Sequence, residues 1–264
     1  MILTVDIGNT TMTIGLYSPD GELYFRGSLK TDKNKTQDQI AIDLLDMFRL
    51  YEAELQGVTG AVISSVVPPM TSATARAIRQ LCGTSPMIVG PGVKTGMNIL
   101  AEIHNQLGAD IVASSVAALQ KYPAPIIVID MGTATTLSYL GKTTYEGCVI
   151  VPGVRLAVEA LSARAAELPY ISLEEPAAVL GRSTIDAMRS GVLYGNAGMI
   201  DSMIQRMEEA AKPAATVVMT GRNADLIRKY CKREIIYDEN LIIDGLYCLY
   251  KKNHDRRRKK SDAT

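Results

Sequence analysis

Two short polar turns, each following a β-rich run, contain residue types that bind phosphate. The first reads DIGNTT (residues 6–11) and the second reads DMGTATT (residues 130–136). A glycine after a strand lets backbone N–H groups approach an anion, and Asn and Thr side chains add donors. The carboxylates of Asp6 and Asp130 repel phosphate unless a cation such as Mg²⁺ bridges the two groups. The pair predicts a site that binds a nucleotide polyphosphate, whereas either turn alone is more typical of a plain hairpin.

A third turn, TGRNA (residues 220–224), follows a predicted strand and precedes a predicted helix. This placement suits the nucleoside or its α-phosphate, since the N-terminus of a helix attracts anions. The chain contains no GxxxxGK[ST] sequence, so a P-loop is excluded as the source of phosphate binding.

The two Asp-Gly-Thr turns mark an internal duplication, because each stands at the head of one half of the chain. Hydrophobic periodicity then predicts alternating helices and strands in both halves. The predicted helices cover residues 37–55, 71–83, 109–122, 157–168, 184–211, 223–231 and 240–252. The predicted strands that follow the first motif of each half cover 21–30, 60–69, 86–90, 143–150, 216–221 and 234–237. We therefore expect two similar α/β lobes, over residues 1–115 and 116–252, with a disordered basic tail over 253–264.

The composition is that of a globular protein with an uneven charge distribution. The 264 residues are 47% hydrophobic and 21% charged, with a formal net charge of zero. Residues 251–260 contain seven basic residues and one acid, so the rest of the chain is acidic by about six charges. We interpret this tail as a solvated terminus; contact with nucleic acid or an acidic partner is the alternative, and nucleic acid is not the expected partner.

Four cysteines without a CxxC pair and only two histidines do not favour a zinc site. Free thiols in a reducing cytoplasm are the expected state. The first residues, MILTVDIGN, lack the basic region of a signal peptide. No apolar run approaches the roughly 18 residues that a membrane helix needs, so no membrane partner is expected.

The paired motifs resemble those of the sugar-kinase, Hsp70 and actin ATPase superfamily. Further motifs narrow the resemblance, over residues 1–250, to type III pantothenate kinase, the Bvg accessory factor-like family. These motifs are SSVVPP (64–69), GPGVKTGMNI (90–99), LGAD (107–110), VIDMGTATT (128–136), PGVRLAVEALSARAAELP (152–169) and STIDAMRSGVLYG (183–195). The resemblance implies an α/β protein with a duplicated actin-like ATPase (ribonuclease H-like) fold and a nucleotide cleft between its lobes.

The same resemblance implies ATP-dependent phosphorylation of pantothenate to 4'-phosphopantothenate, the first step of coenzyme A synthesis, in the cytoplasm. It implies a homodimer that uses Mg²⁺ and a monovalent cation, K⁺ or NH₄⁺. Asp110 matches the general base, Asp130 matches a ligand of the monovalent cation, and Asp6 lies near Mg²⁺, through water. With the third turn included, the expected nucleotide contacts are Asp6, Gly8, Asn9, Thr10, Thr11, Thr13, Gly132, Thr133, Thr135 and Gly221. The expected substrate contacts are Gly92, Thr95, Gly108, Ala109, Ile111 and Thr184, the last closing the pocket at the subunit interface.

The chemistry of phosphoryl transfer favours a base at Asp110 independently. The reaction needs positioning, charge neutralisation and one carboxylate that accepts the hydroxyl proton. LGADIVASSVAALQ (residues 107–120) places Asp110 in the first turn of an apolar helix. An acid in that position also stabilises the helix dipole, which is the alternative role.

Four short segments depart from the family pattern, and three of the changes fall on ligand-facing positions. Ile111 replaces the usual Arg after the base, and Ile cannot supply a planar, charged clamp. The other three departures are Ile103-His104 for Asn-Pro, Gly147-Cys148 for Gly-Gly, and Thr220-Gly221-Arg222 for Thr-Gly-Gly. Three hypotheses stay open: a working pantothenate kinase, a nucleotide-binding homologue with a regulatory role, and a kinase for another small hydroxyl compound.

Overall fold

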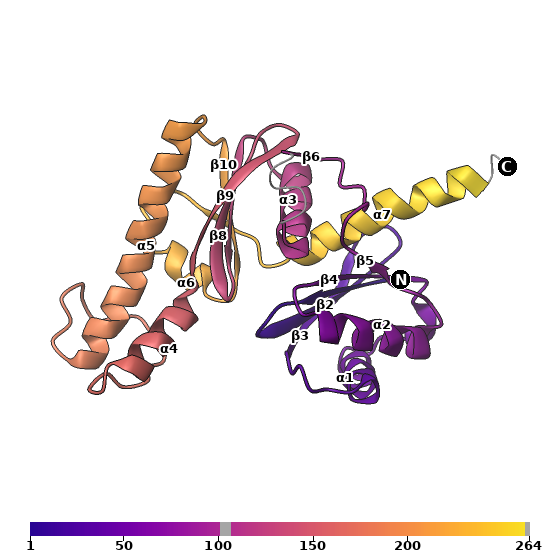
Figure 1. Cartoon of the computed structure of the whole chain (residues 1–264), viewed down its shortest axis with the longest axis horizontal. Coiled ribbons are helices and arrows are strands. Elements are labelled where there is room, and N and C mark those ends of the chain that lie inside the picture. The colour runs from indigo at the N-terminus through magenta and orange to yellow at the C-terminus, as the bar shows by residue number, and fades with distance from the viewer. Residues whose placement is uncertain (101–106, 262–264) are drawn as a thin grey trace. The chain divides into compact units, whose positions relative to one another are not determined.

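The structure is a computed structural model of the chain that describes residues 1–100 and 107–261 (Figure 1). The chain forms two compact units. The first comprises residues 1–120 together with the segment from Asn240 onward, and the second comprises Lys121–Glu239. Among the described residues, no helix combines the length and the apolar character that crossing a bilayer requires.

The first unit is built on a mixed sheet with the strand order β3-β2-β1-β4-β5. β1 pairs antiparallel with β2 and parallel with β4, so the chain makes a hairpin and then a crossover. The strands are β1 (Ile2–Ile7), β2 (Thr11–Tyr17), β3 (Leu23–Lys30), β4 (Gly60–Ser65) and β5 (Met87–Ile88), followed by the two-residue strand β6 (Asn98–Ile99).

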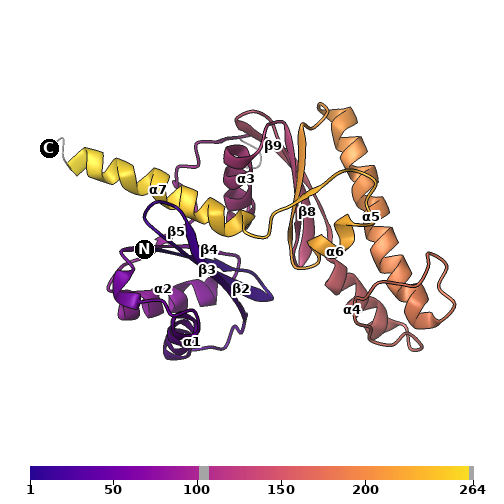
Figure 2. The same cartoon turned by 180° about the vertical axis from the view of Figure 1, so that it is seen from behind.

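Helices cover both faces of this sheet. α1 (Gln37–Leu50) and α2 (Pro68–Cys82) pack on one face, and a short 3₁₀ turn (Leu55–Gly57) lies between them in the chain. α3 (Ala109–Lys121) and the closing helix α7 (Leu241–Ser261) pack on the other. Figures 1 and 2 show α1 and α2 on one side of the sheet and α7 on the opposite side.

Alternation along β1 decides which face each side chain meets. Leu3, Val5 and Ile7 join the cluster under α1 and α2. Ile2 instead joins the cluster of α3 and α7. Because side chains in a strand alternate with a period of two, Asp6 lies on the same face as Ile2, under α3. The strand pattern thus brings the first acidic motif towards the helix that begins with the LGAD sequence.

The second unit repeats the design with the strand order β11-β10-β7-β8-β9. β7 pairs antiparallel with β8 and parallel with β10, as β1 pairs with β2 and β4. Its strands are β7 (Ile126–Met131), β8 (Ala134–Leu140), β9 (Thr144–Pro152), β10 (Thr216–Gly221) and β11 (Ile236–Tyr237). Its helices are α4 (Val154–Arg164), α5 (Thr184–Ala210) and α6 (Ala224–Arg228). Alternate residues of β7, from Ile127 to Met131, pack under these helices.

The structure differs from the sequence-based prediction at three elements. α2 begins at Pro68, within the segment predicted to end a strand, because proline is tolerated in the first turn of a helix. α6 is five residues long, shorter than the helix predicted over 223–231. α7, which was predicted in the second lobe, packs in the first unit because Ile243, Leu246 and Leu249 join its core. The helix also continues to Ser261, past the predicted start of the disordered tail.

Candidate functional site

The first unit brings two predicted acidic residues together. Asp6 is the penultimate residue of β1, on the face covered by α3. Asp110 lies in the first turn of α3. The two carboxylates are close enough that the charge of Asp110 acts on the ionisation of Asp6. Ser64 of β4 pairs with Asp6 across the parallel ladder, so a hydroxyl stands beside the first carboxylate.

The electrostatics of this pair favour a bound cation. Burial, as the larger cause, and the Asp110 carboxylate raise the pKa of Asp6 from 3.8 to about 7, while the Ser64 hydroxyl opposes the rise. A divalent cation beside a carboxylate favours its charged form and so offsets a cost of this kind. A cation such as Mg²⁺ beside Asp6 would therefore offset the cost of ionising this buried carboxylate.

Asp110 is oriented by its own helix. One of its carboxylate oxygens, Oδ1, accepts a hydrogen bond of 2.8 Å from the backbone N–H of Ile111. The same oxygen occupies the space that a Cβ on residue 108 would need, so Gly108 is required for this side-chain orientation. The LGAD sequence thus combines a small residue with an acid so that the acid folds back over the start of the helix.

The position of α3 is fixed by a close crossing with α7. A Cβ on Gly245 would collide with the backbone of Ala113, so the two helices approach within contact of their main chains. Ala113 and Leu246 are fully buried at this crossing. A helix that cannot slide holds Asp110 at a fixed depth over the sheet, which is what a positioned base requires.

The first predicted phosphate loop joins β1 to β2. The N–H of Gly8 donates to the carbonyl of Thr11 at 3.0 Å, and this hydrogen bond closes the turn. Asn9 and Thr10 are exposed at its tip. Thr31 supports the loop from behind, since its hydroxyl donates to the Gly8 carbonyl at 2.7 Å and its N–H donates to the Thr10 carbonyl at 3.1 Å. Thr13, the remaining predicted residue, pairs with Asp6 in the β1–β2 ladder.

The second unit carries the matching turn. Asp130 holds in β7 the place that Asp6 holds in β1, and it pairs with Thr136 and Thr220 of the neighbouring strands. Gly132 donates to the carbonyl of Ala134 at 3.1 Å, so this turn is one residue shorter than the first.

Of the other three residues predicted at the second turn, one is exposed, one is partly exposed and one is buried. Thr133 is exposed, and its carbonyl accepts the N–H of Gly153 at 3.1 Å, just before α4. Gly221 lies beside the turn because it pairs with Met131. Thr135, by contrast, is fully buried, so its predicted nucleotide contact stays a prediction without an exposed side chain to support it.

The predicted substrate loop is an irregular segment of the first unit between β5 and β6. Gly92 is exposed in it. The hydroxyl of Thr95 both donates to the carbonyl of Met97, at 3.0 Å, and accepts its N–H, at 3.1 Å. Thr95 therefore shapes its own turn, and its hydroxyl is engaged within the loop.

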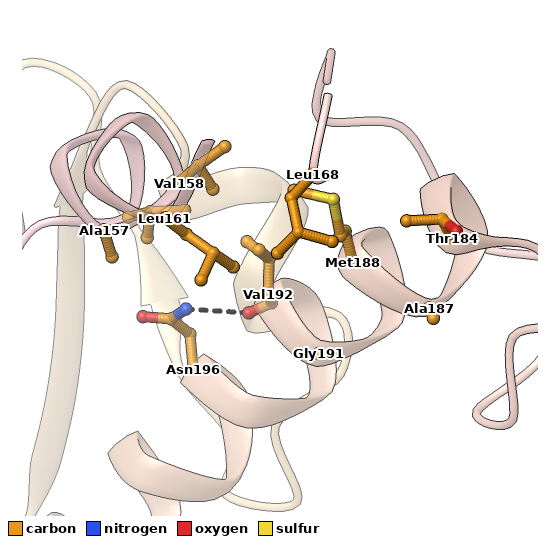
Figure 3. A pocket seen from close by; sticks show the side chains of 11 residues that line it. Ala157, Val158, Leu161, Leu168, Thr184, Ala187, Met188, Gly191, Val192 and Asn196 are labelled. Carbon is orange, nitrogen blue, oxygen red and sulfur yellow. Dashed lines mark hydrogen bonds between the residues drawn. The ribbon is translucent and has the colours of Figure 1, made fainter. Parts of the chain in front are cut away.

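Thr184 lies in a different environment, at one end of an apolar pocket of about 570 Å³ in the second unit (Figure 3). The lining side chains come from α4, α5 and the segment between them, with Leu161, Met188 and Val192 between Thr184 and Asn196. The amide of Asn196 donates to the carbonyl of Val192 at 2.7 Å. A pocket with an amide, a hydroxyl and no charged side chain does not suit a polyphosphate, so this hollow is not the nucleotide site.

The departures from the family pattern lie at defined places. Ile111 is partly exposed in the first turn of α3, directly after the predicted base. Cys148 is exposed in β9, opposite Ser138. Arg222 follows the end of β10. The pair at residues 103–104 lies outside the described residues.

Sequence reasoning missed residues that support the predicted ones. Thr31 lies one residue after β3, and Ser64 lies within β4. The available signal was a polar residue next to apolar ones. Asn253 of α7, described below, gave no local signal because its partners are 159 residues away in the sequence.

A metal ion bound at the first acidic motif would have few protein ligands. In the part of the chain that the structure describes, no three His, Cys, Asp or Glu side chains form a cluster able to hold a metal ion. Mg²⁺ in phosphate-transfer sites takes one or two carboxylates and completes its shell with phosphate and water. Asp6 supplies one such carboxylate.

Comparison with solved structures identifies the fold. A Campylobacter jejuni protein assigned to the Baf family of transcriptional activators is 20% identical, with a TM-score of 0.58 over 96% of this chain and 99% of that one. A Sinorhizobium meliloti protein assigned as a 2-dehydro-3-deoxygalactonokinase is 11% identical, with a TM-score of 0.59 over 96% and 99%. The ADPNP-bound activator of a Clostridium difficile 2-hydroxyisocaproyl-CoA dehydratase is 11% identical, with a TM-score of 0.59 over 98% and 97%. The predicted sugar-kinase and actin-like ATPase fold is thereby confirmed.

The sequence also matches a family model over most of its length. The match covers residues 2–206, which include Asp6, Asp110 and Asp130. The reaction class that goes with this family is that of a kinase, a phosphotransferase acting on a small molecule. The chain belongs to the type III pantothenate kinase family.

Proposed function

We propose that this chain transfers the γ-phosphoryl group of ATP to the primary hydroxyl of pantothenate, giving 4'-phosphopantothenate and ADP. The observation that carries the proposal is the meeting of Asp6 and Asp110 in one unit of a type III pantothenate kinase family member. The hydroxyl oxygen forms the new bond to phosphorus, the bond to the ADP oxygen breaks, and the hydroxyl proton passes to the Asp110 carboxylate.

The roles of the two acids differ because their surroundings differ. Asp110 is oriented by the Ile111 N–H and the absence of a side chain at Gly108, which suits a group that must reach a substrate hydroxyl. Asp6 lies at the end of a buried strand beside Ser64, which suits a group that holds cationic charge near phosphate, directly or through water. Mg²⁺, when bound, neutralises the charge of the phosphate oxygens.

The nucleotide contacts in this proposal come from both units. In the first unit they are the loop residues Gly8, Asn9, Thr10 and Thr11, with Thr13 beside Asp6. In the second unit they are Gly132, Thr133, Thr135 and Gly221, with Asp130 as the ligand of a K⁺ or NH₄⁺ ion. Support comes from the matched ladders, which give Asp6 and Asp130 the same place in the two sheets. Since the reaction consumes ATP, the cytoplasm is the proposed compartment.

Pantothenate, in this proposal, lies against the start of α3 and the loop after β5. The contacting residues are Gly92, Thr95, Gly108, Ala109 and Ile111, with Thr184 reaching the site from a second copy of the chain. Support for a homodimer comes from large apolar side chains that are exposed in the second unit. Leu161 is 45% exposed and Leu180 is 85% exposed. Sedimentation of the wild type and of a Leu161→Lys, Leu180→Lys variant tests this part: a monomeric wild type contradicts it.

A second candidate function is nucleotide binding with a regulatory role. The observation that favours it is Ile111, whose apolar, partly exposed side chain cannot pair with a phosphoryl oxygen or with the pantothenate carboxylate. The Campylobacter jejuni structure assigned to a family of activators agrees with this alternative. An Ile111→Arg variant separates the two: a large gain in turnover over a weak wild type supports a lost kinase activity.

The proposed reaction is tested by mass-spectrometric detection of 4'-phosphopantothenate with ATP, Mg²⁺ and K⁺ or NH₄⁺ present. Parallel reactions contain other small hydroxyl compounds in place of pantothenate. Phosphorylation of pantothenate in preference to the others supports the proposal. Phosphorylation of another compound only, or ATP binding without product, contradicts it.

A further inference from the structure

The loop between β5 and β6 is held by the closing helix α7. Residues 90–97, GPGVKTGM, contain Gly92 and Thr95, which the proposed function places at the pantothenate side. A loop of this kind has few constraints of its own, because it forms no ladder of backbone hydrogen bonds. The contacts made by α7 supply constraints that the loop lacks.

The side-chain amide of Asn253 makes hydrogen bonds to both backbone groups of a single loop residue. Its Oδ1 accepts the N–H of Lys94 at 3.0 Å, and its Nδ2 donates to the carbonyl of Lys94 at 3.0 Å. The side-chain amide thus pairs with Lys94 as a neighbouring strand would. The Nδ2 group also donates to the carbonyl of Leu249 at 2.8 Å, which fixes the orientation of the amide on its own helix.

Lys252 adds a second attachment one residue further along the loop. Its ammonium group donates to the carbonyl of Thr95 at 2.8 Å. The side chain lies directly over Gly96, where a Cβ would collide with it. Consecutive residues of α7 therefore hold consecutive residues of the loop.

The helix that carries these two side chains is firmly anchored in the first unit. Leu246 and Leu249 are fully buried, and Tyr250 is 8% exposed. The hydroxyl of Tyr247 donates to the carbonyl of Pro19 at 3.0 Å, at the turn between β2 and β3. Because Asn253 follows this buried stretch by less than one turn, its amide has a rigid base.

We propose that Asn253 and Lys252 are positioning residues that hold the 90–97 loop in its pantothenate-binding conformation. The inference rests on the proposed function, since it takes the loop to be the substrate side of the site. Affinity falls in proportion to the fraction of molecules whose loop is in the competent conformation. Loss of the three hydrogen bonds of Asn253, each of modest net strength, is expected to raise the KM for pantothenate about tenfold.

The test compares Asn253→Ala, Lys252→Ala and the double variant with the wild type, using Lys251→Ala as the matched control. Lys251 is on the same helix, but its ammonium group faces the carbonyl of Pro19, away from the loop. Two readouts are needed: amide hydrogen exchange of peptides covering residues 90–97, and steady-state KM values for pantothenate and for ATP.

The expected result is faster exchange in the loop and a raised pantothenate KM in Asn253→Ala, a smaller rise in Lys252→Ala and no change in Lys251→Ala. The KM for ATP and the melting temperature stay near the wild-type values. Unchanged loop exchange, an unchanged pantothenate KM, or an equal rise in both KM values overturns the inference while the proposed function stands. A wild type that does not phosphorylate pantothenate overturns the proposed function, and the assignment of the loop as a substrate element falls with it.

Discussion

Replacing Asp6 by asparagine is expected to stabilise the metal-free protein in a pH-dependent manner. The change keeps the shape of the side chain and removes its ionisation. Burial and the neighbouring Asp110 raise the pKa of Asp6 from 3.8 to about 7, so its charged form is disfavoured in the folded state. The contribution of Asp6 to stability is fully present below the unfolded pKa, and it is lost as the pH rises through the folded pKa.

The size of the effect follows from the shift. Each pKa unit corresponds to about 1.36 kcal/mol, so the full shift corresponds to an upper bound of about 4 kcal/mol. Asp6 is partly exposed, and solvent screening reduces the expected value to about 2–4 kcal/mol. Between about pH 4 and about pH 8, the free energy of unfolding of Asp6→Asn should therefore rise relative to wild type by this amount.

The assay is urea denaturation of both proteins at several pH values with EDTA present, followed by the same series with Mg²⁺. In EDTA the difference in free energy of unfolding should grow with pH, and Mg²⁺ should shrink it by neutralising the carboxylates. Asp110→Asn serves as the control that removes the smaller cause of the shift and leaves burial in place. A difference that stays constant across the pH range refutes the electrostatic reasoning.

Two further predictions concern the elements that place Asp110. Gly108→Ala puts a methyl group where Oδ1 of Asp110 lies, so the carboxylate rotates away and kcat should fall by about tenfold or more, with an unchanged melting temperature. A variant with normal kcat contradicts the required orientation. Gly245→Ala forces α7 off the backbone of Ala113 and should cost about 1–3 kcal/mol of stability, measured by urea denaturation. An unchanged free energy of unfolding would show that the two helices can move apart without loss of stability.

The sequence predicted those parts of the fold whose signal is local. The two strands that carry Asp6 and Asp130 are buried at every position except the aspartate, and their polar turns begin where the apolar runs stop. The helix that begins at Ala109 and carries Asp110 was predicted from its apolar periodicity, and the structure confirms it. The amphipathic pattern of α7 predicted a helix but not its partner sheet, because periodicity shows that a face is apolar and not what covers it.

The parts that the sequence did not predict depend on contacts between distant segments. The hydrogen bonds of Asn253 to Lys94 and the close crossing of Gly245 with Ala113 both join α7 to the first half of the chain. A partly exposed asparagine or a glycine within a helix carries no mark of such a partner in the sequence. Thr31 likewise looks like the end of a strand in the sequence. The structure shows that its hydroxyl donates a hydrogen bond to the Gly8 carbonyl.

The proposed kinase activity is tested most directly by ATP turnover with and without pantothenate, with Mg²⁺ and K⁺ or NH₄⁺ present, in the wild type and in Asp110→Asn. A general base typically contributes about 10²–10⁴-fold to the rate. We expect pantothenate-dependent turnover in the wild type and a loss of that size in Asp110→Asn, with ATP still bound. Pantothenate-dependent turnover that survives the substitution contradicts the role of Asp110 as the base, and a wild type that binds ATP without such turnover contradicts the proposed kinase activity.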